Sequence, residues 1–156
     1  MQLLLPPEVG QRLVMALTKA AHREIGGILM GEHVAENMFR VKDLTIQQRG
    51  GGAMFLRRVQ DFFGPLWKFF RATDYNFRRF NYLGEWHSHP SFVPEPSMTD
   101  RQTMRDIVED PQVGAHFAVL LVVKLNDVGQ LDGSVTVYQP RGHELRGQLV
   151  QEREEQ

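Results

Sequence analysis

The sequence predicts a single domain of the α/β class, in which helices lie against a sheet. The chain has 156 residues, enough for one domain with a sizeable hydrophobic core. Segments with the periodicity of a helix alternate with short apolar runs that are typical of strands. We expect the domain to span residues 1–147, followed by a charged C-terminal tail over residues 148–156 that frays.

The first third of the chain is predicted to hold one helix and two strands. Two prolines suit the first turn of a helix, and apolar residues recur at helical spacing through residues 7–21. The apolar run over residues 25–30 predicts a buried strand. Alternating residues over 39–46 predict a second strand, and the three glycines at 50–52 predict a flexible break.

Residues 55–80 combine aromatic and basic side chains. They hold seven of the ten phenylalanines, and six Lys or Arg against two Asp. Because the Gly64-Pro65 pair should interrupt a helix, we expect two helices, over residues 56–63 and 65–80. The simpler interpretation is a helix with Phe packed inward and Arg outward, and the alternative is a docking surface for a protein substrate. Nucleic-acid binding ranks below both because the net charge is −1.

Strands and one helix make up the rest of the predicted domain. A strand over residues 82–88 leads into a histidine-containing segment. Ser97 then opens a helix over about residues 98–108. Apolar, β-branched residues predict strands over 116–124 and 134–138, with a polar turn between them.

Composition excludes several classes of protein. The chain contains no cysteine, which excludes disulfide frameworks and cysteine-ligated zinc. No segment approaches the roughly 18 apolar residues of a transmembrane helix. The N-terminus lacks the basic start of a signal peptide. We therefore expect a cytoplasmic protein without a membrane partner.

The segment WHSHPSFVPEPSMTD carries a candidate metal site made of His87, His89 and Asp100. Alternate residues of a strand face one side, so the two histidines project together. Three prolines stiffen the loop that follows, and Ser97 places Asp100 in the first turn of a helix. Three nitrogen and oxygen ligands suit a zinc ion whose fourth position is open for water, although iron, cobalt and manganese are not excluded.

A hydrolytic metal centre also needs a base and a donor for the oxyanion. Glu24, at the start of the first strand, is the preferred base, and Glu85, on the same strand face as the histidines, is the alternative. Ser97 is a candidate hydrogen-bond donor to a tetrahedral intermediate. Each residue taken alone has a simpler explanation, such as a helix cap for Asp100. Their joint spacing is what favours catalysis.

At these residues the chain resembles the JAMM (MPN+/JAB) metalloprotease family. The family pattern is a Glu on an early strand, then His-x-His-Pro, a Ser after seven intervening residues, and an Asp three residues later. Every position is filled, by Glu24, His87, His89, Pro90, Ser97 and Asp100. The similarity extends over roughly residues 3–140, and the wording YLGEWHSHP looks most like the stand-alone bacterial branch.

The resemblance implies one zinc ion per chain, held by His87, His89 and Asp100, with Glu24 as general base and Ser97 as oxyanion stabiliser. It implies hydrolysis of a peptide or isopeptide bond after the C-terminal glycine of a ubiquitin-like modifier. The implied fold is the MPN (JAB) fold, a curved mixed sheet flanked by helices and similar to cytidine deaminases. Deaminase chemistry itself is disfavoured because its signature needs cysteines.

The resemblance also implies partners. The bacterial branch includes the deconjugating JAMM protein of CBASS anti-phage operons, which implies antiviral defence. The partner would then be a ubiquitin-like modifier or a conjugated target, such as a cGAS-like nucleotidyltransferase. Two alternatives stay open, a non-catalytic MPN-type scaffold and a JAB domain of the DNA-repair-associated kind.

Overall fold

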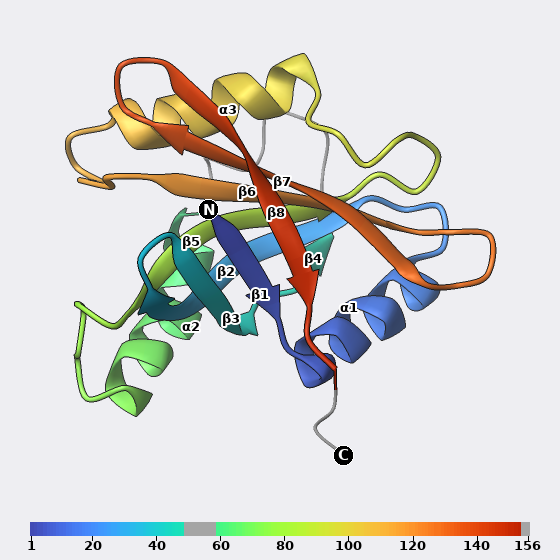
Figure 1. The fold of residues 1–156 in the computed structure, drawn as a ribbon, viewed down its shortest axis with the longest axis horizontal. Helices are drawn as coiled ribbons and strands as arrows, with labels where there is room; N and C mark the ends of the chain where they lie inside the picture. Colours follow the sequence, from blue (N-terminus) through green and yellow to red (C-terminus); the bar gives the residue numbers. More distant parts are fainter. Residues whose placement is uncertain (49–58, 154–156) are drawn as a thin grey trace.

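A strongly curved sheet of parallel and antiparallel strands forms the centre of the protein, with helices packed on its faces (Figure 1). The computed structural model describes residues 1–48 and 59–153. Its helices are α1 (Pro7–Ala20), α2 (Val59–Ala72) and α3 (Met98–Glu109). Its strands are β1 (Gln2–Leu5), β2 (Ile25–Ala35), β3 (Met38–Leu44), β4 (Gln47–Gln48), β5 (Phe80–Ser88), β6 (Ala118–Leu125), β7 (Leu131–Gln139) and β8 (His143–Gln151).

The sheet closes on itself. Its strand order is β3-β1-β8-β7-β6-β5-β2-β4, and β3 also pairs with β2. The predicted α/β class and curved mixed sheet are thus confirmed, with closure into a barrel as an addition. Closure depends on β1 and β8, two strands that the apolar pattern of the sequence did not reveal. No helix in the described part of the chain is long and apolar enough to cross a membrane.

The two faces of the sheet have separate cores. The largest cluster packs α1 against one face and includes Trp86 of β5 and Leu121 of β6. On the other face, α3 packs over β6 and β7, and α2 packs over β2 and β5. Because strand residues alternate between faces, the side chain of His87, next to Trp86, lies on the face that carries α2 and α3. This face holds the candidate site.

The prediction for residues 55–80 was wrong in two respects. One helix, α2, runs through Pro65, and it ends at Ala72 instead of residue 80. Apolar residues of α2, including Phe69, pack on the sheet, and this burial offsets the hydrogen bond that proline removes. The helix ends before Asp74 and Tyr75, which adopt left-handed φ angles of 53° and 55°. The predicted break at residues 50–52 and the start of the first predicted helix lie outside the described residues.

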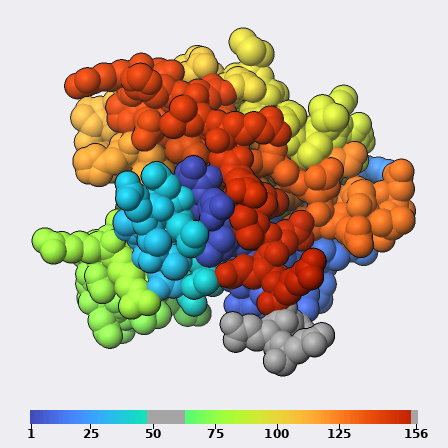
Figure 2. Space-filling view, viewed as in Figure 1, coloured from blue at the N-terminus to red at the C-terminus, as the bar shows by residue number. Residues whose placement is uncertain are grey.

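The predicted tail is part of the barrel over residues 148–151. These residues belong to β8 and pair in parallel with Gln2–Leu5 of β1. Figure 2 shows this C-terminal strand, in red, crossing the surface beside the blue N-terminal strand. The expectation of fraying is wrong here because backbone pairing does not need apolar side chains. Residues 154–156 of the predicted tail lie outside the described part.

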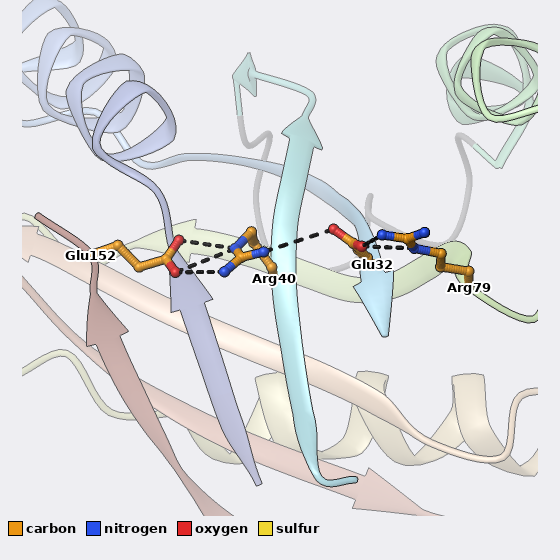
Figure 3. Close-up of polar contacts among 4 residues, drawn as sticks. All are labelled: Glu32, Arg40, Arg79 and Glu152. Atoms are coloured by element: carbon orange, nitrogen blue, oxygen red, sulfur yellow. Dashed lines mark hydrogen bonds and ion pairs between the residues drawn. The ribbon is translucent and has the colours of Figure 1, made fainter. Parts of the chain in front are cut away.

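Four charged side chains join strands that meet at the closure (Figure 3). Glu152, just after β8, accepts hydrogen bonds from Arg40 of β3 at 2.8 and 3.0 Å. Glu32 of β2 is buried and accepts from Arg79, which precedes β5, at 2.8 Å, and its second oxygen lies 3.9 Å from Arg40. The Glu152 carboxylate raises the pKa of Arg40 above its ordinary value. The network links β2, β3, β5 and the end of β8.

Candidate metal centre

The end of β5 presents two histidines on one face. His87 lies in the strand, and His89 is the first residue after the strand ends. The residues between and before them point the other way and are anchored. Trp86 is fully buried and its Nε1–H donates to the carbonyl of Thr45 at 2.8 Å. Ser88 accepts a hydrogen bond from the backbone N–H of Ile25 at 3.0 Å. These anchors fix the direction in which the histidines point.

Strand β2 passes close to the histidines. Gly26 of β2 is paired with His87, and a Cβ at Gly26 would lie 3.0 Å from the His87 Cβ and 2.5 Å from the Trp86 carbonyl oxygen. A side chain at this position would therefore displace β5. Glu24 immediately precedes β2 and His89 immediately follows β5. Because β2 and β5 are antiparallel, the two residues lie at the same end of this strand pair.

The N-terminus of α3 supplies the carboxylate. Ser97 is the N-cap residue, and its Oγ accepts a hydrogen bond from the backbone N–H of Asp100 at 3.1 Å. Asp100 returns the contact, because its Oδ2 accepts from the backbone N–H of Ser97 at 2.8 Å and from its hydroxyl at 2.7 Å. This capping box fixes the Asp100 side chain on a rigid helix end. Asp100 is 3% exposed, so its carboxylate is held away from bulk water.

The three side chains converge on one point. The Nε2 atoms of His87 and His89 lie 3.1 Å apart, and they lie 3.2 and 3.5 Å from Oδ2 of Asp100. A tetrahedral zinc ion with bonds of about 2.0–2.1 Å has ligand atoms about 3.3 Å apart. The three separations match that edge length. The residues therefore fit a tetrahedral ion in distance, in atom type and in burial.

The tautomer of the neutral His89 ring follows from its other ring nitrogen. Nδ1 of His89 lies 3.2 Å from the carbonyl oxygen of Val93. A carbonyl only accepts hydrogen bonds, so Nδ1 carries the proton and Nε2 presents its lone pair to the site. This lone pair faces His87 and the Asp100 carboxylate. A cation stabilises such a collection of lone pairs, and a carbonyl partner on the outer nitrogen is usual for a metal-bound histidine.

The two candidate bases lie in different surroundings. Glu24 is exposed and immediately precedes β2. Glu85 is buried on β5, two residues before His87, and is paired with Ile28 of β2. Burial under α2 raises the pKa of Tyr82 well above its ordinary value, and the nearby Glu85 carboxylate adds to the shift. Glu85 thus belongs to the interior beside α2, whereas Glu24 meets solvent at the start of β2.

Comparison with known proteins identifies the family. Residues 6–132 match the family of prokaryotic homologs of the JAB domain, a range that includes every motif residue. The chain belongs to this family. The resemblance to the bacterial JAMM/MPN branch is therefore confirmed, as is the MPN fold.

Two curated relatives of this chain and one solved structure with a similar fold are informative. The chain is 26% identical over 136 residues to the CD-NTase/cGAS isopeptidase of Enterobacter hormaechei, covering 85% of this chain and 72% of that protein. A stretch of 43 residues, 27% of this chain and 26% of the relative, is 40% identical to the probable metalloprotease y4qB of Sinorhizobium fredii. The fold is similar to that of a Desulfitobacterium hafniense protein, with a TM-score of 0.60, 15% identity, and coverage of 97% and 94% of the two chains.

Some residues of this JAB domain that shape the site escaped sequence reasoning. The carbonyl of Val93 orients His89, and the Ser88 hydroxyl holds the start of β2 beside β5. Thr45 supplies the carbonyl that fixes Trp86. Two of the three act through backbone carbonyls, which no side-chain pattern reveals. Ser88 carried one weak signal, as a polar residue between two candidate ligands at the end of an apolar strand.

Proposed function

We propose that this protein is a zinc-dependent JAMM-type peptidase or isopeptidase that cleaves the bond after the C-terminus of a ubiquitin-like modifier. The observation that carries the proposal is the approach of His87 Nε2, His89 Nε2 and Asp100 Oδ2 to within 3.1–3.5 Å of one another. Membership of the JAB family and the names of the two relatives, an isopeptidase and a probable metalloprotease, support hydrolysis as the reaction class.

The donor set favours zinc as the ion. Two imidazole nitrogens and one carboxylate oxygen, all buried, leave the fourth position of a tetrahedral ion open. In such a site zinc supplies an acidified water, with a pKa of about 7, and polarises the scissile carbonyl. The protein contributes the preorganisation. The capping box holds Asp100, and the Val93 carbonyl sets the tautomer of His89.

We assign Glu24 as the general base. Its place at the start of β2, at the end of the strand pair where β5 leads to His89, and its exposure suit a carboxylate that takes a proton from the attacking water and delivers it to the leaving amine. Glu85 suits this role less well, because it is buried against Ile28 and close to Tyr82 on the side of α2. Ser88 keeps the Glu24 backbone close to β5 through its hydrogen bond to the next residue, Ile25.

Ser97 has two roles in the proposal. Its backbone N–H and hydroxyl both bond to Asp100 Oδ2 and so orient the carboxylate. When substrate is present, the hydroxyl turns from Asp100 toward the oxyanion of the tetrahedral intermediate and stabilises its charge. The backbone N–H stays on Asp100 during this change, so the carboxylate keeps its place.

The similarity to the CD-NTase/cGAS isopeptidase supports a conjugated protein as substrate. We propose a cGAS-like nucleotidyltransferase linked to a ubiquitin-like modifier, in the cytoplasm and in antiviral defence. The extended C-terminal tail of the modifier would enter beside Glu24 and His89, and its terminal glycine carbonyl would lie over the ligand cluster. A non-catalytic MPN-type scaffold is the less favoured candidate, because scaffolds usually lack part of the motif and this chain keeps every position.

The decisive experiment combines metal analysis with hydrolysis. We expect the purified protein to contain about one zinc per chain, and to release 7-amino-4-methylcoumarin from ubiquitin-like tails joined to it through their terminal glycine. Chelation should abolish release and added zinc should restore it. A metal-free protein with unchanged activity would exclude the metalloenzyme. A protein that binds zinc and cleaves no tail in a panel of such substrates would support the scaffold.

A further inference from the structure

We propose that β8 positions the helix that carries Asp100, and that Glu144 of β8 is a positioning residue of the metal centre. The inference rests on the proposed function, because it concerns the same metal ligand. It adds a role for a strand that contains none of the motif residues and that lies beyond residues 6–132, the part that matches the JAB family.

Glu144 contacts the helix at two points. One oxygen of its carboxylate pairs with Arg101, the residue next to Asp100, and the other lies 3.2 Å from Arg105, one turn further along α3. The Glu144 side chain is only 20% exposed, so the three charges are partly shielded from solvent. A single carboxylate thus bridges two guanidinium groups that would otherwise repel each other at i, i+4 spacing.

Two further contacts hold the same segment at its ends. Before the helix, Glu95 of the proline-rich loop pairs with Arg146 of β8 at 2.7 Å. At the end of the helix, the Glu109 carboxylate accepts backbone hydrogen bonds from Arg141 and Gly142 in the turn between β7 and β8. Residues 95–109 are therefore anchored at three successive points to residues 141–146. The loop and helix run along the hairpin instead of contacting it once.

Two charged residues of α3 oppose the helix dipole and find their partners through these contacts. A helix is stabilised by acidic side chains near its start and by basic ones near its end. Asp100 follows this rule, but Arg101 stands just after the first turn and Glu109 lies in the last turn. The helix dipole does not explain these two charges. Glu144 and the β7–β8 turn supply their partners, and a broken local rule of this kind points to a tertiary role.

The strand register aims Glu144 at the helix. Glu144 is paired with Tyr138 of β7, and Tyr138 is buried in the cluster beneath α3. Arg146 is paired with Thr136 and so faces the same side. Because Arg101 directly follows Asp100, a shift of this end of α3 moves the ligand. Metal sites need their ligands held within about 0.5 Å of the productive geometry. Without the Glu144 carboxylate, the guanidinium groups of Arg101 and Arg105 would also repel a divalent cation.

The test is a zinc titration of the metal-free protein against a chromophoric chelator. We expect Glu144→Gln to weaken zinc affinity about tenfold, the range for partners that orient a ligand. Glu152→Gln is the matched control, because Glu152 lies at the other end of β8 and pairs with Arg40 at a similar exposure of 27%. The control should lower the melting temperature as much as Glu144→Gln and leave zinc affinity unchanged.

Each outcome decides the proposal. Equal zinc affinity of the parent protein and Glu144→Gln, with melting temperatures matched to the control, would overturn it. Glu144→Asp keeps the charge and should recover most of the affinity, and a loss equal to that of Glu144→Gln would count against it. If Glu144→Gln does not fold, zinc affinity is compared between the parent protein and Arg105→Gln, which loses one of the two Glu144 ion pairs and keeps the one to Arg101. A parent protein that binds no zinc would refute the proposed function itself, and with it this inference.

Discussion

Asp100 serves a helix end and the proposed metal site with one carboxylate. Its Oδ2 accepts both hydrogen bonds from Ser97 and also faces the two histidine nitrogens. A cap of this kind stabilises a helix by about 1 kcal/mol. The same bonds remove the rotamer freedom that a free aspartate would lose on binding an ion. Local structure and site geometry therefore depend on the same atoms, so that any substitution of Asp100 affects both.

Replacement of Glu24 should separate zinc binding from catalysis. Glu24→Gln removes the proton acceptor and leaves all three proposed ligands, so we expect about one zinc per chain and a rate lowered by a factor of about 10²–10⁴. Metal analysis and coumarin release measure the two properties. Glu85→Gln is the matched comparison. If Glu24→Gln kept full turnover and Glu85→Gln lost it, the base would be Glu85.

Tyr82 predicts how stability responds to alkaline pH. Burial, with a smaller contribution from Glu85, raises the pKa of Tyr82 well above 10. The unfolded chain ionises this phenol near pH 10, whereas the folded protein keeps it neutral, so the stabilisation is full below pH 10 and is lost as pH rises further. We expect the melting temperature of Tyr82→Phe to fall less steeply between pH 9 and 11.5 than that of the parent. Parallel curves would contradict the assignment.

At the scale of residues, spacing predicted that His87, His89 and Asp100 come together. The spacing of residues along the chain predicts that two histidines lie on one strand face and that an aspartate lies in the first turn of a helix. The partners that orient them were not predictable. Val93 acts through its carbonyl, and Glu144 lies about forty residues from Asp100 in a strand with no strong apolar pattern. Such contacts depend on topology, which pattern alone did not determine.

A β-bulge in β5 lets one strand serve two purposes. The register with β2 shifts between Leu29 and Met30, which pair with Gly84 and Tyr82, so that Leu83 is the extra residue. Without the shift, Tyr82 and Glu85 would point to opposite faces of the sheet. With it, Tyr82 packs beneath α2 while Glu85 and the histidines still share that face. Strand β5 thus joins the α2 core to the candidate metal site.

Gly84 makes this bulge possible, and its replacement should be costly. Its φ is +149°, and a Cβ there would lie 2.0 Å from the carbonyl oxygen of Val119 in β6. We expect Gly84→Ala to lower the free energy of unfolding by about 3 kcal/mol or more, since backbone must move. Denaturant titration measures the change. Gly64→Ala is the control, because a Cβ at Gly64, in α2, would have no neighbouring atom within 4 Å. This substitution should raise the free energy of unfolding by up to about 1 kcal/mol.

Elements with a strong apolar period were predicted closely, and those defined by contacts were not. The first predicted helix, residues 7–21, corresponds to α1, and the helix opened by Ser97 corresponds to α3. The helix break at Gly64-Pro65 failed because the rule considers one hydrogen bond and ignores the packing of α2 on the sheet. A local penalty of a few kcal/mol is smaller than the burial of several large apolar side chains.

The barrel as a whole depends on a strand that resembled a tail. The fully buried Leu3 lies in β1, which is flanked by β3 and β8. In β8, Leu145 is 55% exposed and charged or polar residues surround it, so alternation gave little indication of a strand. Closure is a long-range property, because β1 and β8 are separated by almost the whole chain. The class of fold could be predicted from local patterns, but the closing strands could not.

Truncation after Gly147 tests this closure. The shortened chain loses the four pairs between β1 and residues 148–151, together with the Arg40–Glu152 ion pair (Figure 3). At about 1 kcal/mol for each backbone hydrogen bond, the loss is about 3–4 kcal/mol, which corresponds to a fall in melting temperature of about 10 °C for a domain of this size. A chain that ends at Arg153 keeps every one of these contacts and is the control. Glu144 and its pairing with Tyr138 remain in the truncated chain, so stability should fall while zinc affinity is kept, whereas a dispensable tail would leave stability unchanged.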